Sequence, residues 1–209
     1  TIGGGHANAI HAHSATIGGG IGNVIYGKAN NSVITGGANN TVGLTSYDSS
    51  INGGWFNMIG SNSYNAVIGG GSFNTIEKSA EVNTIAGGRA NLIGENVARA
   101  TIGGGFANTI YSESYHSLIA GGAHNVVSNI AYDSVISGGF YNLIGSNSFN
   151  GVIGGGSFNV IEDKAEASTI AGGRGNRITK YAYRSTISGG VSNTNGADHA
   201  TIGGGVGNL

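Results

Sequence analysis

The sequence is built from one short repeat, and the length of this repeat limits what the chain can fold into. An Ile followed by one small residue and Gly-Gly recurs along the whole chain, with a step of 15 once, 17 ten times and 15 once more. The thirteen leading isoleucines are Ile2, Ile17, Ile34, Ile51, Ile68, Ile85, Ile102, Ile119, Ile136, Ile153, Ile170, Ile187 and Ile202. Helical-pair repeats need about 33 residues or more, so this period excludes them.

A second column of the repeat is asparagine, six residues after each leading Ile. Its members are Asn8, Asn23, Asn40, Asn57, Asn74, Asn91, Asn108, Asn125, Asn142, Asn159, Asn176, Asn193 and Asn208. Two residues further on the chain carries Ile or Val, except where Asn195 stands. We expect the thirteen asparagines to form a structural ladder of side-chain amides bonded from coil to coil, because stacked amides satisfy buried polar groups in this way.

The repeat predicts an all-β fold, a parallel β-solenoid of about thirteen coils. Inward apolar positions alternate with outward positions around each leading Ile and each following Ile or Val, as in strands. Two strands of about four or five residues and two turns account for one repeat, with coils stacked about 4.8 Å apart. Gly-Gly would cost a helix about 2 kcal/mol relative to Ala. In a solenoid it suits a turn with positive φ or a close backbone approach.

Two cross-sections are compatible with this repeat. The Ile column and the Ile/Val column predict two facing stacks and hence a flattened, two-sided roll. Within a coil, the leading Ile, its Asn and a small residue (Ala80, Ser114, Ala131 or Ala165) also follow one another at steps of six, which leaves a three-sided coil as an alternative. We favour two sides because the third carries no regular aliphatic column.

The repeat fills one predicted domain, residues 1–209. Residues 50–57 return in similar form at 135–142, and 67–74 return at 152–159. The offset in sequence number is 85, or five steps of 17, so a five-coil block is duplicated. The sequence starts and stops inside a repeat, and we expect it to be a fragment of a longer fibrous protein.

Composition excludes several classes of function. The net charge is −1 and only 9% of residues are charged, so the chain has no field to attract nucleic acid. Cysteine is absent, which excludes a zinc–thiolate site and a thiol nucleophile. No stretch approaches the ~20 apolar residues of a transmembrane helix, so we expect no membrane insertion.

The unit Ala-Thr-Ile-Gly-Gly-Gly-Phe-Ala-Asn-Thr-Ile at 100–110 resembles the Gly- and Asn-rich repeats of trimeric autotransporter adhesin heads. It is also similar to the fibre repeats of phage-tail-like proteins, and the resemblance covers the whole chain. It implies a left-handed β-roll, three copies side by side and display at the cell surface or outside the cell. The repeat of the adhesin heads is shorter than the one in this chain, which bears on how three copies would pack. Independently, the small uncharged residues that flank the leading isoleucines predict self-association, and we expect this strip or the neighbouring aromatic turns to form the homotrimer interface.

Exposed aromatic residues are the candidate ligand-binding positions. Adjacent bulky residues in a turn are hard to bury in so thin a coil, and aromatic rings suit stacking on sugars or contact with a protein receptor. The candidates are Trp55, Phe56, Phe73, Phe140, Tyr141 and Phe158. The alternative is that these rings cover the solenoid turns or fill a subunit interface.

No catalytic residue, metal site or cofactor is predicted. Glu162 and Asp163 are sequence neighbours among cations, unlike the two carboxyl groups that flank a glycosidase cleft. We expect Arg89 and Arg174, which occupy equivalent places in the two copies of the block, to pair with this charged rim or with another subunit. His6, His11 and His13 lack the acidic partner that would favour a metal site.

These features predict a structural and adhesive fibre segment and no enzyme. A solenoid gives stiffness and length, and the expected partner is a surface protein or glycan of a host or prey cell. The alternatives are an ice-binding solenoid and a phage or contractile-tail fibre repeat. Thr precedes the leading Ile in seven of thirteen repeats and forms no paired array, which disfavours ice binding. Constant coil length argues against a carbohydrate-degrading β-helix, because functional insertions in solenoids are extra loops.

Overall fold

The computed structural model describes all 209 residues as an all-β parallel solenoid without helices. The chain divides into two compact units, unit 1 (Thr1–Gly105) and unit 2 (Phe106–Leu209). Unit 1 contains β1 (Ala9–Ile10), β2 (Thr16–Ile17), β3 (Val24–Ile25), β4 (Val33–Ile34), β5 (Thr41–Val42), β6 (Ser50–Ile51), β7 (Met58–Ile59), β8 (Val67–Ile68), β9 (Thr75–Ile76), β10 (Thr84–Ile85), β11 (Leu92–Ile93) and β12 (Thr101–Ile102). Unit 2 contains β13 (Thr109–Ile110), β14 (Leu118–Ile119), β15 (Val126–Val127), β16 (Val135–Ile136), β17 (Leu143–Ile144), β18 (Val152–Ile153), β19 (Val160–Ile161), β20 (Thr169–Ile170), β21 (Arg177–Ile178), β22 (Thr186–Ile187), β23 (Thr194–Asn195) and β24 (Thr201–Ile202).

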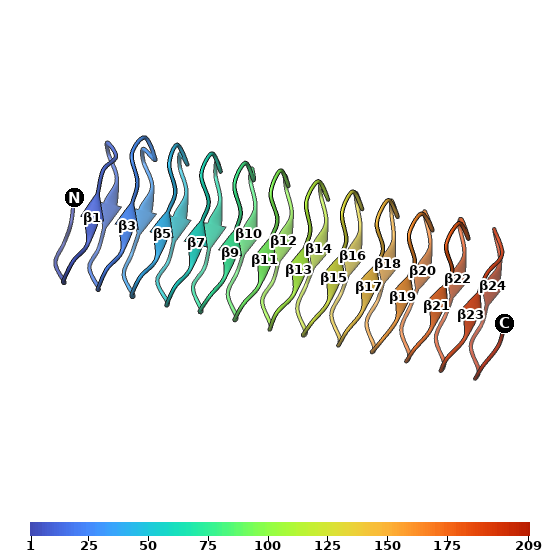
Figure 1. The fold of residues 1–209 in the computed structure, drawn as a ribbon. Helices are drawn as coiled ribbons and strands as arrows, with labels where there is room; N and C mark the ends of the chain where they lie inside the picture. The colour runs from blue at the N-terminus through green and yellow to red at the C-terminus, as the bar shows by residue number, and fades with distance from the viewer. The chain divides into compact units, whose positions relative to one another are not determined.

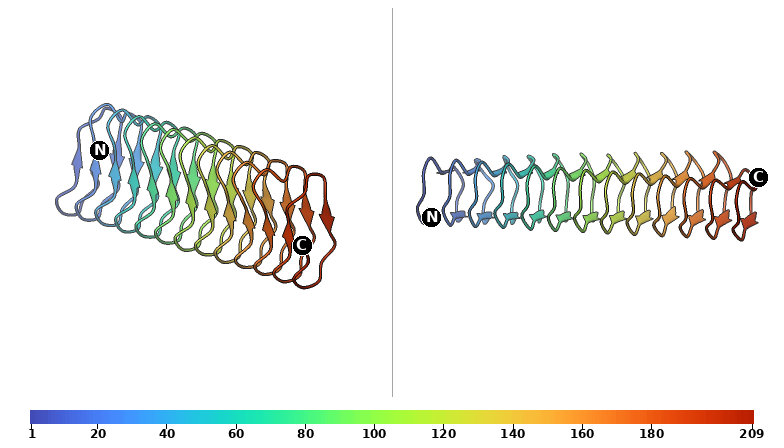
Figure 2. Two further views of the ribbon diagram at one scale, coloured as in Figure 1. Left: turned by 45° about the vertical axis from the view of Figure 1, so that its right-hand side comes forward. Right: turned by 90° about the horizontal axis from the view of Figure 1, so that it is seen from below.

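Each unit has two parallel sheets, one of odd-numbered and one of even-numbered strands. Pairing is in register with the repeat, so that Ile85 of β10 lies opposite Ile68 of β8 on one side and Ile102 of β12 on the other. Successive coils of a unit stack directly on one another, and the two sheets form its two broad faces (Figures 1 and 2). The parallel solenoid with the predicted repeat and two sides is therefore confirmed, while the left-handed sense stays a prediction.

The structure corrects two details of the predicted coil. Eleven coils carry both strands, and the first and last of the thirteen predicted coils carry one strand each. Ile2, for example, makes only an isolated bridge with Ile17. The strands are two residues long and not four or five. They end early because positive-φ residues bend the chain beside them, as at Phe56 and Asn62 on either side of β7.

The core consists of the two predicted aliphatic columns. Ile51 and Ile68 of the leading column and Ile59 and Ile76 of the facing column are completely buried, each between equivalents in neighbouring coils. Burial of such a side chain contributes roughly 1.5–3 kcal/mol. Where Asn195 interrupts the facing column, its side chain bonds the backbone of Ala197 and Ala200. The last repeat, from Ile187 to Ile202, has 15 residues and not 17, and its backbone thus satisfies the buried side chain of Asn195.

The second glycine of each Gly-Gly pair is required by the stacking of coils. Gly37 has φ +85°, and a Cβ there would lie 2.1 Å from the carbonyl oxygen of Gly54 in the next coil. Gly36, the first glycine of the same pair, has open space around its Cβ position. The expected positive φ and close backbone approach are both confirmed, but they belong to the second glycine.

Asparagine side chains join the coils beside this turn. The amide of Asn57 donates to the carbonyl oxygens of Gly53 in its own coil and Gly71 in the next, each at 3.0 Å. Its side-chain oxygen accepts the backbone N–H of Asn74 at 3.0 Å. Asn57 thus supplies the partners of Gly53 O and of the Asn74 N–H and adds a second donor to Gly71 O, which also accepts the backbone N–H of Trp55. Asn57 is fully buried, so water does not reach these groups.

Serines form further ladders under the turns that follow the odd strands. The hydroxyl of Ser63 donates to the carbonyl oxygen of Glu77 at 2.9 Å and accepts the backbone N–H of Ala80 at 3.3 Å. Ser46, one coil earlier, donates to Gly60 and accepts from Ser63 in the same way. No buried side-chain nitrogen or oxygen lacks a hydrogen-bond partner. On the third side, Ser114 is therefore a hydrogen-bonding group under a turn, whereas Ala80, Ala131 and Ala165 are small buried residues, and this side forms no third sheet.

Candidate ligand-binding surface

The aromatic candidates of unit 1 meet in one cluster on the turn between the two strands of a coil. Phe56 and Phe73 stack with ring centroids 5.5 Å apart and planes within 1°. Trp55 packs edge-on against both rings at 5.0 Å. About half of the Trp55 surface (50%) stays exposed. We call Trp55, Phe56 and Phe73 the unit 1 ledge.

Unit 2 carries an equivalent cluster, the unit 2 ledge, made by Phe140, Tyr141 and Phe158. Tyr141 and Phe158 stack at 5.5 Å, and Phe140 lies edge-on to both rings. His124 extends the stack by packing on Tyr141 at 4.6 Å, with planes within 6°. Sequence reasoning missed His124, although its position, five residues after a leading Ile, is the one that Tyr141 occupies in the next coil.

The stacked rings occupy a backbone position that suits glycine. Phe56 and Phe158 have φ of 53° and 57°, and the same place in other coils is held by Gly22 and Gly175. A non-glycine residue in this region costs roughly 1–2 kcal/mol. Half-burial and stacking of the ring offset part of this cost, since Phe158 is 47% exposed and packs on Tyr141. The turn would accept a glycine, so the rings are not required by the fold of the turn.

An arginine lies two coils beyond the leading ring of each ledge. Backbone bridges connect Phe140 to Ser157 and Ser157 to Arg174, and the same order links Trp55 through Ser72 to Arg89. With coils about 4.8 Å apart, each arginine lies about 10 Å along the turn from that ring. None of the ion pairs within the chain includes Arg174, so pairing with the acidic rim is absent here and pairing with another subunit stays a prediction.

A shallow depression of about 400 Å³ adjoins the unit 2 ledge. It is lined by Phe158, Arg174, Gly175, Val191 and Ser192. Gly175 follows Phe158 in the column of stacked rings and has no side chain to cover it. The depression therefore combines an aromatic ring, a guanidinium group and a hydroxyl group within neighbouring coils.

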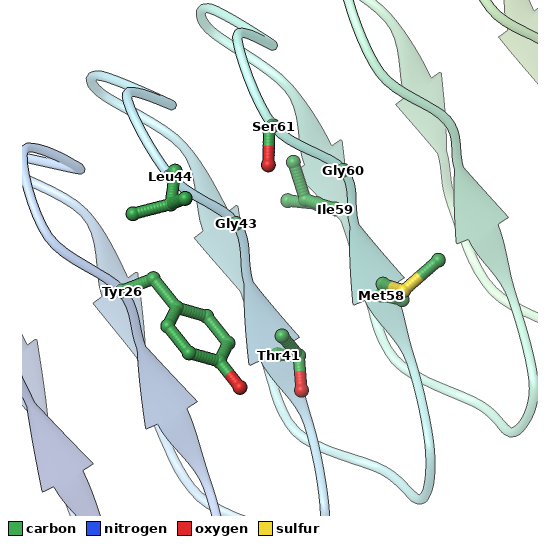
Figure 3. A pocket seen from close by; sticks show the side chains of 8 residues that line it. All are labelled: Tyr26, Thr41, Gly43, Leu44, Met58, Ile59, Gly60 and Ser61. Atoms are coloured by element: carbon green, nitrogen blue, oxygen red, sulfur yellow. The ribbon is translucent and has the colours of Figure 1, made fainter.

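A second, apolar depression of about 280 Å³ lies over the odd-numbered strands of unit 1 (Figure 3). Tyr26, Leu44 and Met58 surround it, and its floor includes Gly43 and Gly60, where side chains are absent. A Cβ on Gly43 would lie 2.7 Å from the backbone of Gly60, so this glycine is needed for close packing of the coils. This depression is thus a consequence of the close packing of coils at Gly43 and Gly60.

Aromatic residues on the opposite turn form separate stacks. Tyr47 stacks on Tyr64 at 5.7 Å in unit 1. Tyr115, Tyr132 and Phe149 stack in unit 2 at 5.2 and 5.1 Å. These rings are half-buried and cover the turns above the serine ladders. The alternative interpretation, in which aromatics cover turns, thus describes this set.

The charged residues connect neighbouring coils. Glu162 pairs with Arg177 and also accepts the backbone N–H of Lys180, while Asp163 accepts the backbone N–H of Ser146. In unit 1, Lys78 pairs with Glu95 at 3.0 Å. The carboxyl groups of the Glu162 and Asp163 pair thus bind the protein itself on an exposed rim.

No group of three or more His, Asp or Glu side chains is placed to hold a metal ion. Of the three histidines near the start of the chain, His11 stacks on Tyr26 at 6.4 Å and His13 donates its backbone N–H to Asn30. None of the elements is a helix with the length and apolar character needed to cross a membrane. Comparison with known protein families and with curated proteins finds no match for this chain.

Proposed function

We propose that this chain is a structural and adhesive segment of a fibre displayed outside the cell, and that its two ledges contact the surface of a host or prey cell. The observation that carries the proposal is the repetition of one exposed arrangement in both units. Each unit presents an aromatic pair, then Ser and Phe, then Arg, in three successive coils. The turns do not need these rings, so a role in binding accounts for them better than a role in folding.

The coil framework suits such a role. Neighbouring coils are joined by backbone and Asn bonds and, where the turn carries a serine, by Ser bonds, as Asn57 and Ser63 illustrate. A side chain on a turn is therefore held by the coils on both sides. A ledge fixed in this way loses little conformational freedom on binding, which favours affinity. The sequence resemblance to adhesin heads and phage-tail fibres supports the same class of function.

We further propose that copies of the chain associate, as three chains, through the faces of the even-numbered strands. The outward residues of these strands include Val67 and Thr84 in unit 1 and Val135 and Val152 in unit 2. Neither these positions nor the residues after the leading isoleucines carry a charge. The odd-numbered sheet, by contrast, exposes Arg177. An uncharged, flat face is suited to contact with a second copy of itself.

Retention of coated microspheres under flow tests the adhesive role. Microspheres carrying the chain are passed over surfaces coated with mixed cell-surface glycans or with extracellular-matrix proteins. We expect retention by the wild-type chain and its loss when all six ledge aromatics are replaced by Ser. Retention no greater than that of bare microspheres on every surface would overturn the adhesive proposal.

Ice binding is the second candidate, and the same uncharged face favours it. Threonine occupies the outward position of β10, β12, β20, β22 and β24. Valine or leucine interrupts the threonines at other strands, as in β16 and β18, so the hydroxyl array is incomplete. A thermal-hysteresis assay separates the two functions, because an adhesive fibre should show none.

A further inference from the structure

We propose that the depression beside the unit 2 ledge binds a sugar ring that carries an anionic group, a carboxylate or a sulfate. The ring stacks on Phe158 and the anionic group binds the guanidinium of Arg174. This inference rests on the adhesive function proposed above and names the ligand class for it.

The first element of the site is an uncovered aromatic face. His124, Tyr141 and Phe158 form a continuous stack with centroid spacings of 4.6 and 5.5 Å. The stack ends at Phe158, because the next residue of the column is Gly175. A Cβ built on Gly175 would have only Ser192 Oγ within 4 Å, at 3.5 Å, so the space beside the ring is open. A flat apolar ring face of this kind accepts the C–H face of a sugar.

The second element is an uncompensated positive charge. Arg174 is exposed and lines the same depression, one coil beyond Phe158. It takes part in none of the ion pairs, although Arg177 nearby in the sequence is paired with Glu162. A guanidinium group binds a carboxylate or sulfate through two parallel hydrogen bonds, which favours an anionic ligand over a neutral one.

Hydroxyl groups complete the site. Ser192 lines the depression, and Ser157 lies between Phe140 and Arg174 in the bridged column. Both residues are at least partly exposed. Their hydroxyls can donate to and accept from sugar hydroxyls, whereas an apolar partner would leave them unpaired. A nucleic acid would in addition require a basic surface, and the net charge of the chain is −1.

Unit 1 repeats the arrangement. Phe73 ends its stack where the small Ala90 follows it in the column, and Arg89 is bridged to Ser72 as Arg174 is to Ser157. Arg89 already has an interaction partner within the chain, so the proposed site is confined to unit 2.

Calorimetric titration of the full chain with trigalacturonate tests the proposal, with neutral galactotriose as the matched probe. We expect one site for trigalacturonate and at least about tenfold weaker binding of galactotriose, the difference that one charge-assisted hydrogen bond supplies. Arg174→Gln should lower the affinity for trigalacturonate to that for galactotriose and leave galactotriose binding unchanged. Phe158→Ala should weaken both sugars at that site.

Two matched controls accompany these variants, Arg184→Gln for charge and Phe149→Ala for an aromatic on the opposite turn. Both should bind as the wild-type chain does, and all variants should keep the wild-type circular dichroism spectrum. The proposal is overturned if trigalacturonate and galactotriose bind equally, if Arg174→Gln has no effect, or if hexaglutamate binds as tightly as trigalacturonate. If these results occur while microspheres are still retained under flow, the ligand class is wrong and the adhesive function stands. If retention is absent as well, the adhesive function fails.

Discussion

The side-chain oxygen of Asn57 accepts a hydrogen bond from the backbone N–H of Asn74, its equivalent in the next coil, at 3.0 Å. The same amide group donates to the carbonyl oxygens of Gly53 and Gly71. One buried side chain therefore satisfies three backbone groups on two coils. The asparagine column is thus a part of the backbone hydrogen-bond ladder, and the first predictions concern it.

Asn57→Ala should lower the free energy of unfolding by about 3 kcal/mol or more, because each buried backbone group left unpaired costs about 1–3 kcal/mol. Asn57→Asp keeps the shape but places a carboxylate against two carbonyl oxygens. Burial there raises the pKa of the introduced carboxyl, so the variant should be more stable in acid and lose stability as the pH rises. Denaturant titrations at several pH values check both variants. Equal stability of Asn57→Asp in acid and at neutral pH would contradict the account.

The two glycines of a pair should respond differently to Ala. Gly37→Ala introduces a Cβ 2.1 Å from a backbone oxygen at φ +85° and should cost about 3 kcal/mol, the sum of overpacking and backbone strain. Gly36→Ala has free space and should be neutral, or more stable by up to about 1 kcal/mol. Equilibrium unfolding of the pair checks this prediction, and equal losses for both variants would speak against the coil geometry.

The serine ladder should make a smaller, measurable contribution. Ser63→Ala leaves the N–H of Ala80 and the carbonyl of Glu77 without their partner, and a loss of about 1–3 kcal/mol is expected. Chemical denaturation measures the loss, and hydrogen exchange at Ala80 should accelerate in the variant. Unchanged exchange at Ala80 would show that the hydroxyl does not join these coils.

The ion pairs of the rim should contribute little. Lys78 and Arg177 have side chains that are 67% and 54% exposed, and exposed pairs are worth about 1 kcal/mol or less. Lys78→Gln and Arg177→Gln should each change the free energy of unfolding by less than about 1 kcal/mol in physiological salt. A loss of several kcal/mol in either variant would be inconsistent with a rim that is open to solvent.

The sequence predicts most of this fold because one repeat sets every coil. The spacing of Ile17 and Ile25, with Asn23 between them, specifies two inward columns and the buried amide, and the structure has all three. Strand length was overestimated because positive-φ residues beside the strands, as at Phe56 and Asn62, cannot be recognised from hydrophobic alternation. The sequence did not predict the ladder of Ser46 and Ser63, because Ala occupies the same column in other coils. The column therefore indicates only that the side chain must be small.

The ledges were only partly predictable. Adjacent bulky residues at Trp55 and Phe56 indicate exposure, and these rings are exposed. The sequence did not predict which rings stack across coils, or that Gly175 would leave the face of Phe158 open. These features depend on the direction of side chains at positive φ and on the residue in the next coil.

Self-association should depend on the even-numbered sheet. Val135→Lys with Val152→Lys places two charges on the outward face of β16 and β18, where like charges of associating copies would repel. Sedimentation should show trimers for the wild-type chain at micromolar concentration and monomers for the variant. Lys at Thr109 and Val126, on the odd-numbered sheet, is the matched control. A wild-type chain that sediments as a stable monomer would contradict the proposed interface.

The central claim is that the ledge rings serve binding and not folding. The direct test is to measure both properties on one variant in which the six ledge aromatics are replaced by Ser. We predict a variant that still folds, with a denaturant midpoint lowered only by the loss of the half-buried ring contacts, and no retention on the glycan surface that holds the wild type. A variant that unfolds much earlier, or that is retained as strongly as the wild-type chain, would contradict this assignment of the ledges.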